Sequence, residues 1–273
     1  MDLKNSPLGV FDSGLGGLTA LKELKSLCPN ENIIYFGDTG RVPYGTKSAQ
    51  TIKRYALEDA RFLKSFGVKA ILVACGTVST NAMTELREAF GDGVMGVIEP
   101  TVEKACAVTR ENGTLLVLGT EATICSGVYE KLVSSLRPDI KIISKACPLF
   151  VPLVENGYVS ADNTAVSAIV CDYIGEYAGC VDTVILGCTH YPLLSDAISK
   201  ALPGAKLVNS GTEAARGIKE YLEKNSLQAE RKKGSTKIYV SDGVRNFEKF
   251  ANAFLGEEPD GVTKINIEDY FKP

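Results

Sequence analysis

The sequence has only one histidine, His190, and its eight cysteines include no Cys-x-x-Cys pair. Because a closed zinc site needs several closely spaced Cys or His ligands, this composition argues against one, and we expect no bound metal. No apolar run approaches the length that crosses a bilayer. Residues 1–7 lack the basic segment followed by an apolar one that marks a signal peptide. We therefore expect a cytoplasmic protein.

An excess of charge of one sign is also missing. The formal net charge of −3 gives no indication of a nucleic acid or an acidic membrane surface as a partner. The 273 residues, 45% of them hydrophobic, suit a soluble globular protein with one large domain or two of moderate size. The cysteines are scattered along a chain that shows no export signal, so we expect reduced thiols rather than disulfides.

Short apolar runs alternate with amphipathic stretches along the whole chain. The runs that predict strands are Leu8–Phe11, Ile33–Phe36, Ala70–Ala74, Leu115–Leu118, Ile140–Ile143, Val181–Leu186 and Lys237–Val240. The stretches that predict helices include Leu18–Leu27, Ala49–Phe66, Thr80–Phe90, Thr164–Tyr177, Ser195–Leu202 and Gly211–Lys224. This alternation predicts an α/β fold with mostly parallel sheets.

The chain contains a coarse internal repeat. The strand ending at Asp12 and the strand ending near Thr120 each run into a turn rich in Gly, Ser or Thr. At a similar distance further on, each half has an apolar run that leads to a cysteine, Cys75 or Cys188. The repeat predicts two pseudo-symmetric lobes that face each other. The strand pattern after residue 235 is expected to return to the first lobe. The first lobe would then comprise residues 1–98 with 209–273, and the second residues 99–208.

Cys75 and Cys188 are candidate catalytic residues. Each follows an apolar run and a small residue, which is typical of a buried parallel strand that opens into a loop. Ligands bind at such carboxyl ends in open α/β sheets. A thiol that faces a helix N-terminus there has a lowered pKa. Two matched thiols suit a reaction whose substrate and product are mirror images.

The alternative for any of these thiols is a buried structural cysteine that packs as a small hydrophobe. We apply this interpretation to Cys28, Cys106, Cys125, Cys171 and Cys180.

Asp12 stands directly before a glycine turn, residues 13–17, at the expected start of a helix. Such a turn exposes backbone N–H groups to an anion. With Asp38 further along, it has some features of a dinucleotide fingerprint. The Gly-x-Gly-Gly spacing departs from that fingerprint, however, and a carboxylate before the turn would repel a pyrophosphate. We interpret Asp12 as a proton-handling group near a thiol, with a helix N-cap as the alternative.

His190 and Glu155 are a second candidate pair. His190 comes two residues after Cys188, where it could exchange a proton with the thiol. A carboxylate partner such as Glu155 would raise the pKa of the histidine and keep it a competent acid. The alternatives are a histidine that only bonds the scaffold and a surface carboxylate at a helix end.

A series of motifs between residue 9 and about residue 211 resembles the glutamate racemases, the cofactor-independent enzymes of the aspartate/glutamate racemase superfamily. The motifs are Asp12-Ser-Gly-x-Gly-Gly17, Tyr35-Phe-Gly-Asp38, Val42-Pro-Tyr-Gly45, Ala74-Cys-x-Thr77, Val97-Ile-Glu-Pro100, Gly187-Cys-Thr-His190 and Asn209-Ser-Gly211. The glycine turns are weak signals one by one, whereas the paired cysteine motifs in this order are specific.

The resemblance implies two flavodoxin-like lobes with the active site in the cleft between them. It also implies racemisation of L-glutamate to D-glutamate for peptidoglycan synthesis, without a cofactor, usually by a homodimer. Cys75 and Cys188 would be the catalytic thiols. Asp12 would assist the first, and Glu155 and His190 the second. The substrate site would be lined by Ser13, Pro43, Tyr44, Gly45, Gly76, Thr77, Thr120, Thr123 and Thr189.

Gly76 departs from the family pattern, which usually has Asn directly after the first cysteine. That amide contacts the substrate in the family, and losing one such hydrogen bond costs about 0.5–1.5 kcal/mol. Gly76 therefore keeps open a different amino-acid substrate, such as aspartate. A two-lobed protein that only binds its ligand and a nucleotide-dependent oxidoreductase are the further alternatives.

Overall fold

Parallel β-sheets form the frame of the molecule, which the computed structural model describes for residues 3–270 apart from the side chain of residue 246. The first sheet has the strand order β10-β9-β2-β1-β3-β4, and every pairing in it is parallel. Its strands are β1 (Leu8–Asp12), β2 (Ile33–Gly37), β3 (Ala70–Val73), β4 (Val94–Gly96), β9 (Thr236–Val240) and β10 (Val262–Lys264). The central strands β1, β2 and β3 are buried along their full length, as expected where both faces of a parallel sheet are covered.

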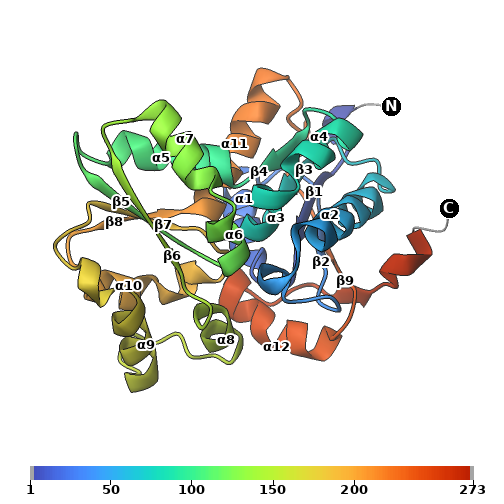
Figure 1. Cartoon of the computed structure of the whole chain (residues 1–273). Helices are drawn as coiled ribbons and strands as arrows, with labels where there is room; N and C mark the ends of the chain where they lie inside the picture. The colour runs from blue at the N-terminus through green and yellow to red at the C-terminus, as the bar shows by residue number, and fades with distance from the viewer. Residues whose placement is uncertain (1–2, 271–273) are drawn as a thin grey trace.

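The second sheet repeats the order of the first. It is also parallel, with the order β6-β5-β7-β8. Its strands are β5 (Thr114–Gly119), β6 (Lys141–Ala146), β7 (Thr183–Leu186) and β8 (Lys206–Asn209). This order matches β2-β1-β3-β4 strand for strand, so the predicted pair of pseudo-symmetric α/β lobes is confirmed (Figure 1). β9 pairs with β2, which confirms the return of the chain to the first lobe. The residue boundaries between the lobes stay a prediction.

Helices surround both sheets. They are α1 (Leu18–Leu27), α2 (Ala49–Lys64), α3 (Gly76–Asn81), α4 (Met83–Phe90), α5 (Ile98–Val108), α6 (Glu121–Cys125), α7 (Val128–Leu136), α8 (Phe150–Glu155), α9 (Thr164–Ile174), α10 (Ser195–Ala201), α11 (Ser210–Lys224) and α12 (Val244–Leu255). Short 3-10 helices occur at η1 (Leu3–Asn5), η2 (Tyr44–Thr46), η3 (Gly175–Tyr177), η4 (Tyr191–Leu194) and η5 (Ile267–Tyr270). α11 packs against both α1 and α5, and so ties the two halves of the chain together.

One predicted helix, residues 80–90, is wrong in both its start and its continuity. The chain is helical already from Gly76, and it breaks at Ala82, whose φ of −133° and ψ of 3° lie outside the helical region. The break separates α3 from α4 and leaves Cys75 as the residue directly before α3. A cysteine at the end of β3 is therefore followed at once by a helix.

A continuous core joins the lobes. Val10 and Leu72 of the first sheet belong to the same cluster of buried apolar side chains as Leu116 and Ile185 of the second. Burial of apolar surface is the main favourable term in folding, so the lobes are stabilised against each other and not only connected by the chain.

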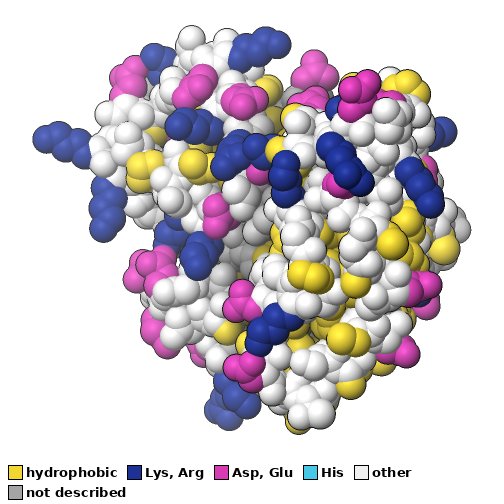
Figure 2. Space-filling model, turned by 90° about the vertical axis from the view of Figure 1, so that its left-hand side faces the viewer, with side chains coloured by type: hydrophobic (Ala, Val, Ile, Leu, Met, Phe, Trp, Pro, Cys, Tyr) yellow, Lys and Arg dark blue, Asp and Glu magenta, His cyan; other side chains and the backbone are white. Residues whose placement is uncertain are grey.

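The surface agrees with the balanced composition. On the face shown in Figure 2, basic and acidic side chains are interspersed, as the small net charge predicts. Within residues 3–270, no helix has the length and apolar character needed to span a membrane.

Candidate active site

A cavity of about 250 Å³ lies where the carboxyl ends of the two sheets meet. It is lined from the first lobe by segments that follow β1, β2 and β3, and from the second by segments that follow β5, β6 and β7. The lining includes every site residue predicted from the sequence except Asp12 and Thr123: Ser13, Pro43, Tyr44, Gly45, Cys75, Gly76, Thr77, Thr120, Glu155, Cys188, Thr189 and His190. The structure thus brings the two cysteine motifs into one space.

Cys75 lies at the end of β3 and is 5% exposed. Its thiol donates to the hydroxyl of Ser13 over 3.7 Å. Burial, followed by the nearby Asp12 carboxylate, raises the pKa of the Cys75 thiol to about 12. The expectation of a lowered pKa is wrong, because the N–H group of Val78 in α3 lowers the pKa of Cys75 by less than loss of hydration raises it. Free Cys75 is a thiol at neutral pH.

Asp12 ends β1 and lies beneath the glycine turn rather than in the cavity lining. Its Oδ2 accepts hydrogen bonds from the N–H groups of Gly14 and Gly17, each at 3.0 Å. These two N–H groups are therefore not available to an anion, contrary to the sequence-based expectation. The other oxygen, Oδ1, is buried without a hydrogen-bond partner among the described residues. Burial raises the pKa of Asp12 despite these bonds and the charge of His190. The two hydrogen bonds of Asp12 thus help to shape the glycine turn.

Cys188, His190 and Glu155 are connected by hydrogen bonds, and this series of three side chains is called the His190 relay below. The Sγ of Cys188 lies 3.8 Å from Nδ1 of His190, and Nε2 of His190 lies 3.0 Å from Oε1 of Glu155. Burial lowers the pKa of His190, but its hydrogen bonds to Cys188 and Glu155 outweigh this and raise the pKa to about 10. The imidazole therefore carries a proton at neutral pH and can donate it toward the sulfur.

The two lobes touch closely beside this relay. A Cβ on Gly16 would lie 2.1 Å from Oγ1 of Thr189, so only glycine fits there. The hydroxyl of Thr19 donates to the carbonyl of Thr189 over 3.0 Å. A Cβ on Gly76 would lie 2.3 Å from the carbonyl oxygen of Gly187. Gly16 thus lets the first lobe approach the side chains of Thr189 and His190, and Gly76 lets it approach the backbone of Gly187.

Threonine hydroxyls form a chain across the cavity wall. Oγ1 of Thr77 lies 3.0 Å from Oγ1 of Thr120, which lies 3.0 Å from Oγ1 of Thr123. Thr123 is not part of the lining but bonds Thr120 from behind. Among the described lining residues there is no Lys or Arg. An anionic ligand would therefore be held by hydroxyls, backbone N–H groups and the His190 imidazolium.

Several lining residues were not predicted from the sequence, and Cys147 is the most notable. It follows β6 directly, has no exposed surface, and its thiol pKa is raised to about 12 by burial. The strand prediction stopped at Ile143, which hid its position at a strand end. The others are Gly14, Val42, Thr46, Glu121, Pro148, Val151 and Pro152.

Within residues 3–270, no group of three or more His, Cys, Asp or Glu side chains is placed to hold a metal ion, in the cavity or elsewhere.

Similarity to known proteins extends over nearly the whole chain. The family described as Asp/Glu/hydantoin racemase matches residues 18–218. A glutamate racemase of Geobacter metallireducens is 43% identical over 264 residues, which are 96% of this chain and 97% of the relative. A crystal structure of glutamate racemase from Francisella tularensis in complex with D-glutamate has a TM-score of 0.91 at 36% identity, covering 98% of this chain and 100% of that one. An aspartate racemase of Picrophilus torridus, at 18% identity with a TM-score of 0.57 over 80% of this chain and 94% of that one, shares the fold alone.

Proposed function

The chain belongs to the Asp/Glu/hydantoin racemase family, and from this we propose that it interconverts L-glutamate and D-glutamate and so supplies D-glutamate for peptidoglycan. Relatives that match it at about 40% identity over nearly their full length are glutamate racemases. The aspartate racemase shares only the fold, so glutamate is favoured over aspartate as the substrate despite Gly76.

One observation carries the proposal: two buried thiols from opposite lobes line one cavity. Cys75 enters the cavity from the end of β3, and Cys188 enters it from the end of β7. Removal of the α-proton from one enantiomer, and its return on the other face, needs a base and an acid on opposite sides of the Cα atom. Cys75 and Cys188 are the pair that we assign to these roles.

The groups around Cys188 differ from those around Cys75, and so does the way in which each thiol would hold its proton. Cys188 is next to an imidazolium that stabilises a thiolate, whereas Cys75 has a hydroxyl and a buried carboxyl group nearby. In our proposal the Cys188 thiolate removes the α-proton of one enantiomer, and the Cys75 thiol donates its own proton to the opposite face. The reverse reaction uses the Cys75 thiolate and the Cys188 thiol, so the protons balance in both directions.

The remaining groups stabilise the charge that develops on the substrate. Thr77, Thr120 and Thr189 supply hydroxyls for its carboxylates, and His190 supplies a positive charge. Fixed donors in a site that excludes water stabilise an enolate-like transition state more than bulk water does. We assign Asp12 to the Cys75 side, where its unpaired oxygen can exchange a proton.

The proposal includes a location in the cytoplasm, which rests on the sequence of residues 1–7 and on the resemblance, and a homodimer, which rests on the resemblance alone. Sedimentation velocity of the purified protein tests the dimer.

Exchange in heavy water tests the function itself. The reduced protein is incubated with L-glutamate in D₂O without any cofactor, while proton NMR follows the α-hydrogen and circular dichroism follows optical activity. We expect both signals to decay together. Persistence of both signals would overturn the proposal, and the same assay with aspartate would then test the alternative substrate.

A further inference from the structure

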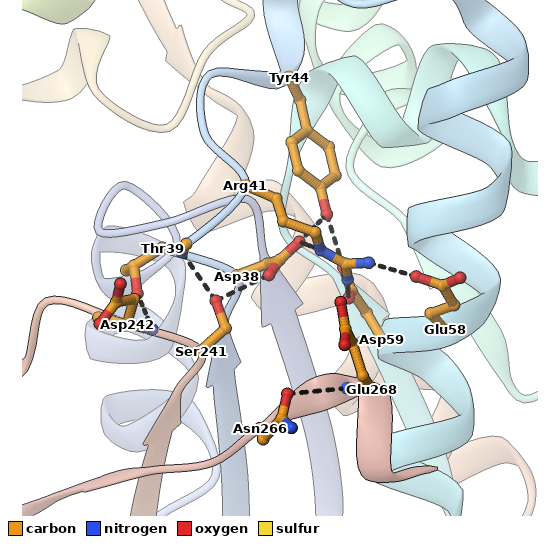
Figure 3. Close-up of polar contacts among 11 residues, drawn as sticks. Asp38, Thr39, Arg41, Tyr44, Glu58, Asp59, Ser241, Asp242, Asn266 and Glu268 are labelled. Atoms are coloured by element: carbon orange, nitrogen blue, oxygen red, sulfur yellow. Dashed lines mark hydrogen bonds and ion pairs between the residues drawn. The ribbon is translucent and has the colours of Figure 1, made fainter. Parts of the chain in front are cut away.

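A cluster of charged side chains lies outside the cavity lining and has no part in the proposed proton transfers. At its centre is Arg41, whose Nε donates to Asp38 over 2.6 Å and whose Nη2 donates to Asp59 over 2.9 Å. Glu58 pairs with the same guanidinium, and Ser241 donates to the second oxygen of Asp38 over 2.8 Å (Figure 3). The carboxylates of Asp38 and Asp59 have no exposed surface. Buried charges of this kind are stable only when they are paired.

Tyr44 connects the cluster to the cavity. It belongs to the cavity lining, yet its hydroxyl donates to Asp38 and lies 3.1 Å from Oδ2 of Asp59. Burial, together with the two carboxylates, raises the pKa of Tyr44 well above its ordinary value, so the hydroxyl stays a donor. The hydroxyl is therefore directed toward the cluster (Figure 3). The hydroxyl of Tyr44 therefore bonds carboxylates of the protein rather than groups in the cavity.

The loop of residues 42–46 follows Arg41 and precedes α2, and every one of its residues lines the cavity. Arg41 and Tyr44 are the two anchors of this loop. Arg41 precedes the loop and Tyr44 stands in its middle, and both bond the same two carboxylates. Tyr55 of α2 adds a third contact: its ring lies 5.5 Å from the Tyr44 ring and 4.0 Å from the Arg41 guanidinium. The far end of the loop, η2, packs against α6 of the second lobe.

We propose that Arg41, Asp38 and Asp59 form a positioning cluster that holds the Tyr44 loop (residues 42–46) in the shape that binds the substrate. The cluster acts through the loop and does not touch the reacting atoms. It rests on the proposed function, because the substrate is the glutamate of that proposal. Loosening the loop weakens substrate binding and leaves the thiols and the His190 relay in place. Variants that loosen the loop should therefore raise KM and leave kcat almost unchanged.

Two variants test the cluster from its two anchors. Tyr44→Phe keeps the ring and removes the hydroxyl. Arg41→Lys keeps the charge and removes the planar guanidinium group that bonds two carboxylates at once. We expect each to raise KM for both enantiomers about tenfold, the effect of one lost hydrogen bond to a charged group, with kcat changed less than about twofold. The double variant should raise KM less than the product of the single effects, because both anchors act on the same carboxylates. The matched control is Tyr239→Phe, which removes a hydroxyl from a ring packed on Phe62 and Phe66 and should leave KM unchanged.

Binding of D-glutamate by calorimetry gives a second readout that needs no turnover. If Arg41→Lys does not fold, the Tyr44→Phe variant still decides the question. An active wild type whose Tyr44→Phe variant keeps both KM and the dissociation constant would overturn the cluster's role, as would a fall in kcat at constant KM. A wild-type protein that binds D-glutamate without racemising it would overturn the proposed function instead, and the dissociation constants of the variants would still test the cluster.

Discussion

Gly76 and Gly187 meet backbone to backbone across the two lobes. A Cβ on Gly76 would lie 2.3 Å from the carbonyl oxygen of Gly187 and 3.4 Å from its carbonyl carbon. Gly76 follows Cys75, and Gly187 precedes Cys188, so this contact sets how closely the two thiol-bearing segments approach. Gly76 is the residue that departs from the pattern implied by the resemblance, and in this chain it makes a close backbone contact.

Gly76→Ala should therefore force the two segments apart. Because the clashing atom is backbone, the added methyl group cannot be relieved by a side-chain rotation, and we expect a loss of about 1–3 kcal/mol in the free energy of unfolding. A wider separation of the thiols should also lower kcat/KM. Thermal unfolding and steady-state kinetics check both effects.

Gly217→Ala in α11 is the matched control, since its Cβ would meet only Pro100 at an ordinary 3.6 Å. Ala in place of a helical Gly is neutral or stabilising where there is room. If Gly76→Ala behaved like this control, the close approach of the lobes would be refuted.

Asp12 offers a pair of variants that separates structure from chemistry. Asp12→Asn keeps an oxygen that can accept from the N–H groups of Gly14 and Gly17, whereas Asp12→Ala removes both bonds. We expect Asp12→Asn to unfold close to the wild-type temperature but to lose kcat more than it gains in KM, because an amide cannot exchange a proton with the Cys75 side. Asp12→Ala should lose stability as well. Full kcat in Asp12→Asn would reduce Asp12 to a support for the turn.

His190 can be titrated without overlap, because it is the only histidine in the chain. Its NMR resonances should titrate near pH 10, since the bonds to Cys188 and Glu155 outweigh burial and raise the pKa of His190. Glu155→Gln removes one of those partners and should lower that pKa. An unchanged titration in Glu155→Gln would show that the carboxylate does not support the imidazolium.

The same shift has a consequence for stability. The pKa of His190 in the folded protein, about 10, lies above the value of about 6.5 for an unfolded chain. The stabilisation from its pairing is therefore complete below pH 6.5 and is lost as the pH rises through 10. Chemical denaturation across this range should show the decline in the wild type and a smaller one in His190→Asn.

The sequence predicts the frame well because buried parallel strands are apolar along their whole length. All of the predicted strands appear within a few residues of the expected ends, and the repeat around Cys75 and Cys188 places both thiols in one cavity. The short strands β4, β8 and β10 and the helices α5, α6, α7 and α12 were not among the elements named from the sequence. β4 and β10 have only three residues each, too few for a clear pattern, and α5 carries Pro100 in its first turn, where a missing N–H costs nothing.

Several features of the site could not be predicted from local sequence patterns. The pKa of Cys75 moves opposite to the helix-dipole expectation, because burial and the Asp12 carboxylate outweigh the N–H groups of α3. The motifs place Tyr44 in the substrate site, but they do not predict that its hydroxyl bonds Asp59. Asp59 lies on α2, further along the chain. Cys147 joins the cavity through a strand that runs longer than its apolar residues. Each of these depends on tertiary contacts that a single sequence does not display.

Cysteine variants in heavy water test the two-thiol account most directly. Cys75→Ala and Cys188→Ala are each incubated with L-glutamate and with D-glutamate in D₂O, beside the wild type and Cys106→Ala, which removes a buried thiol outside the cavity. We predict that the wild type and Cys106→Ala racemise both enantiomers, and that neither active-site variant racemises either one. Racemisation near the wild-type rate by Cys75→Ala or by Cys188→Ala would contradict the account.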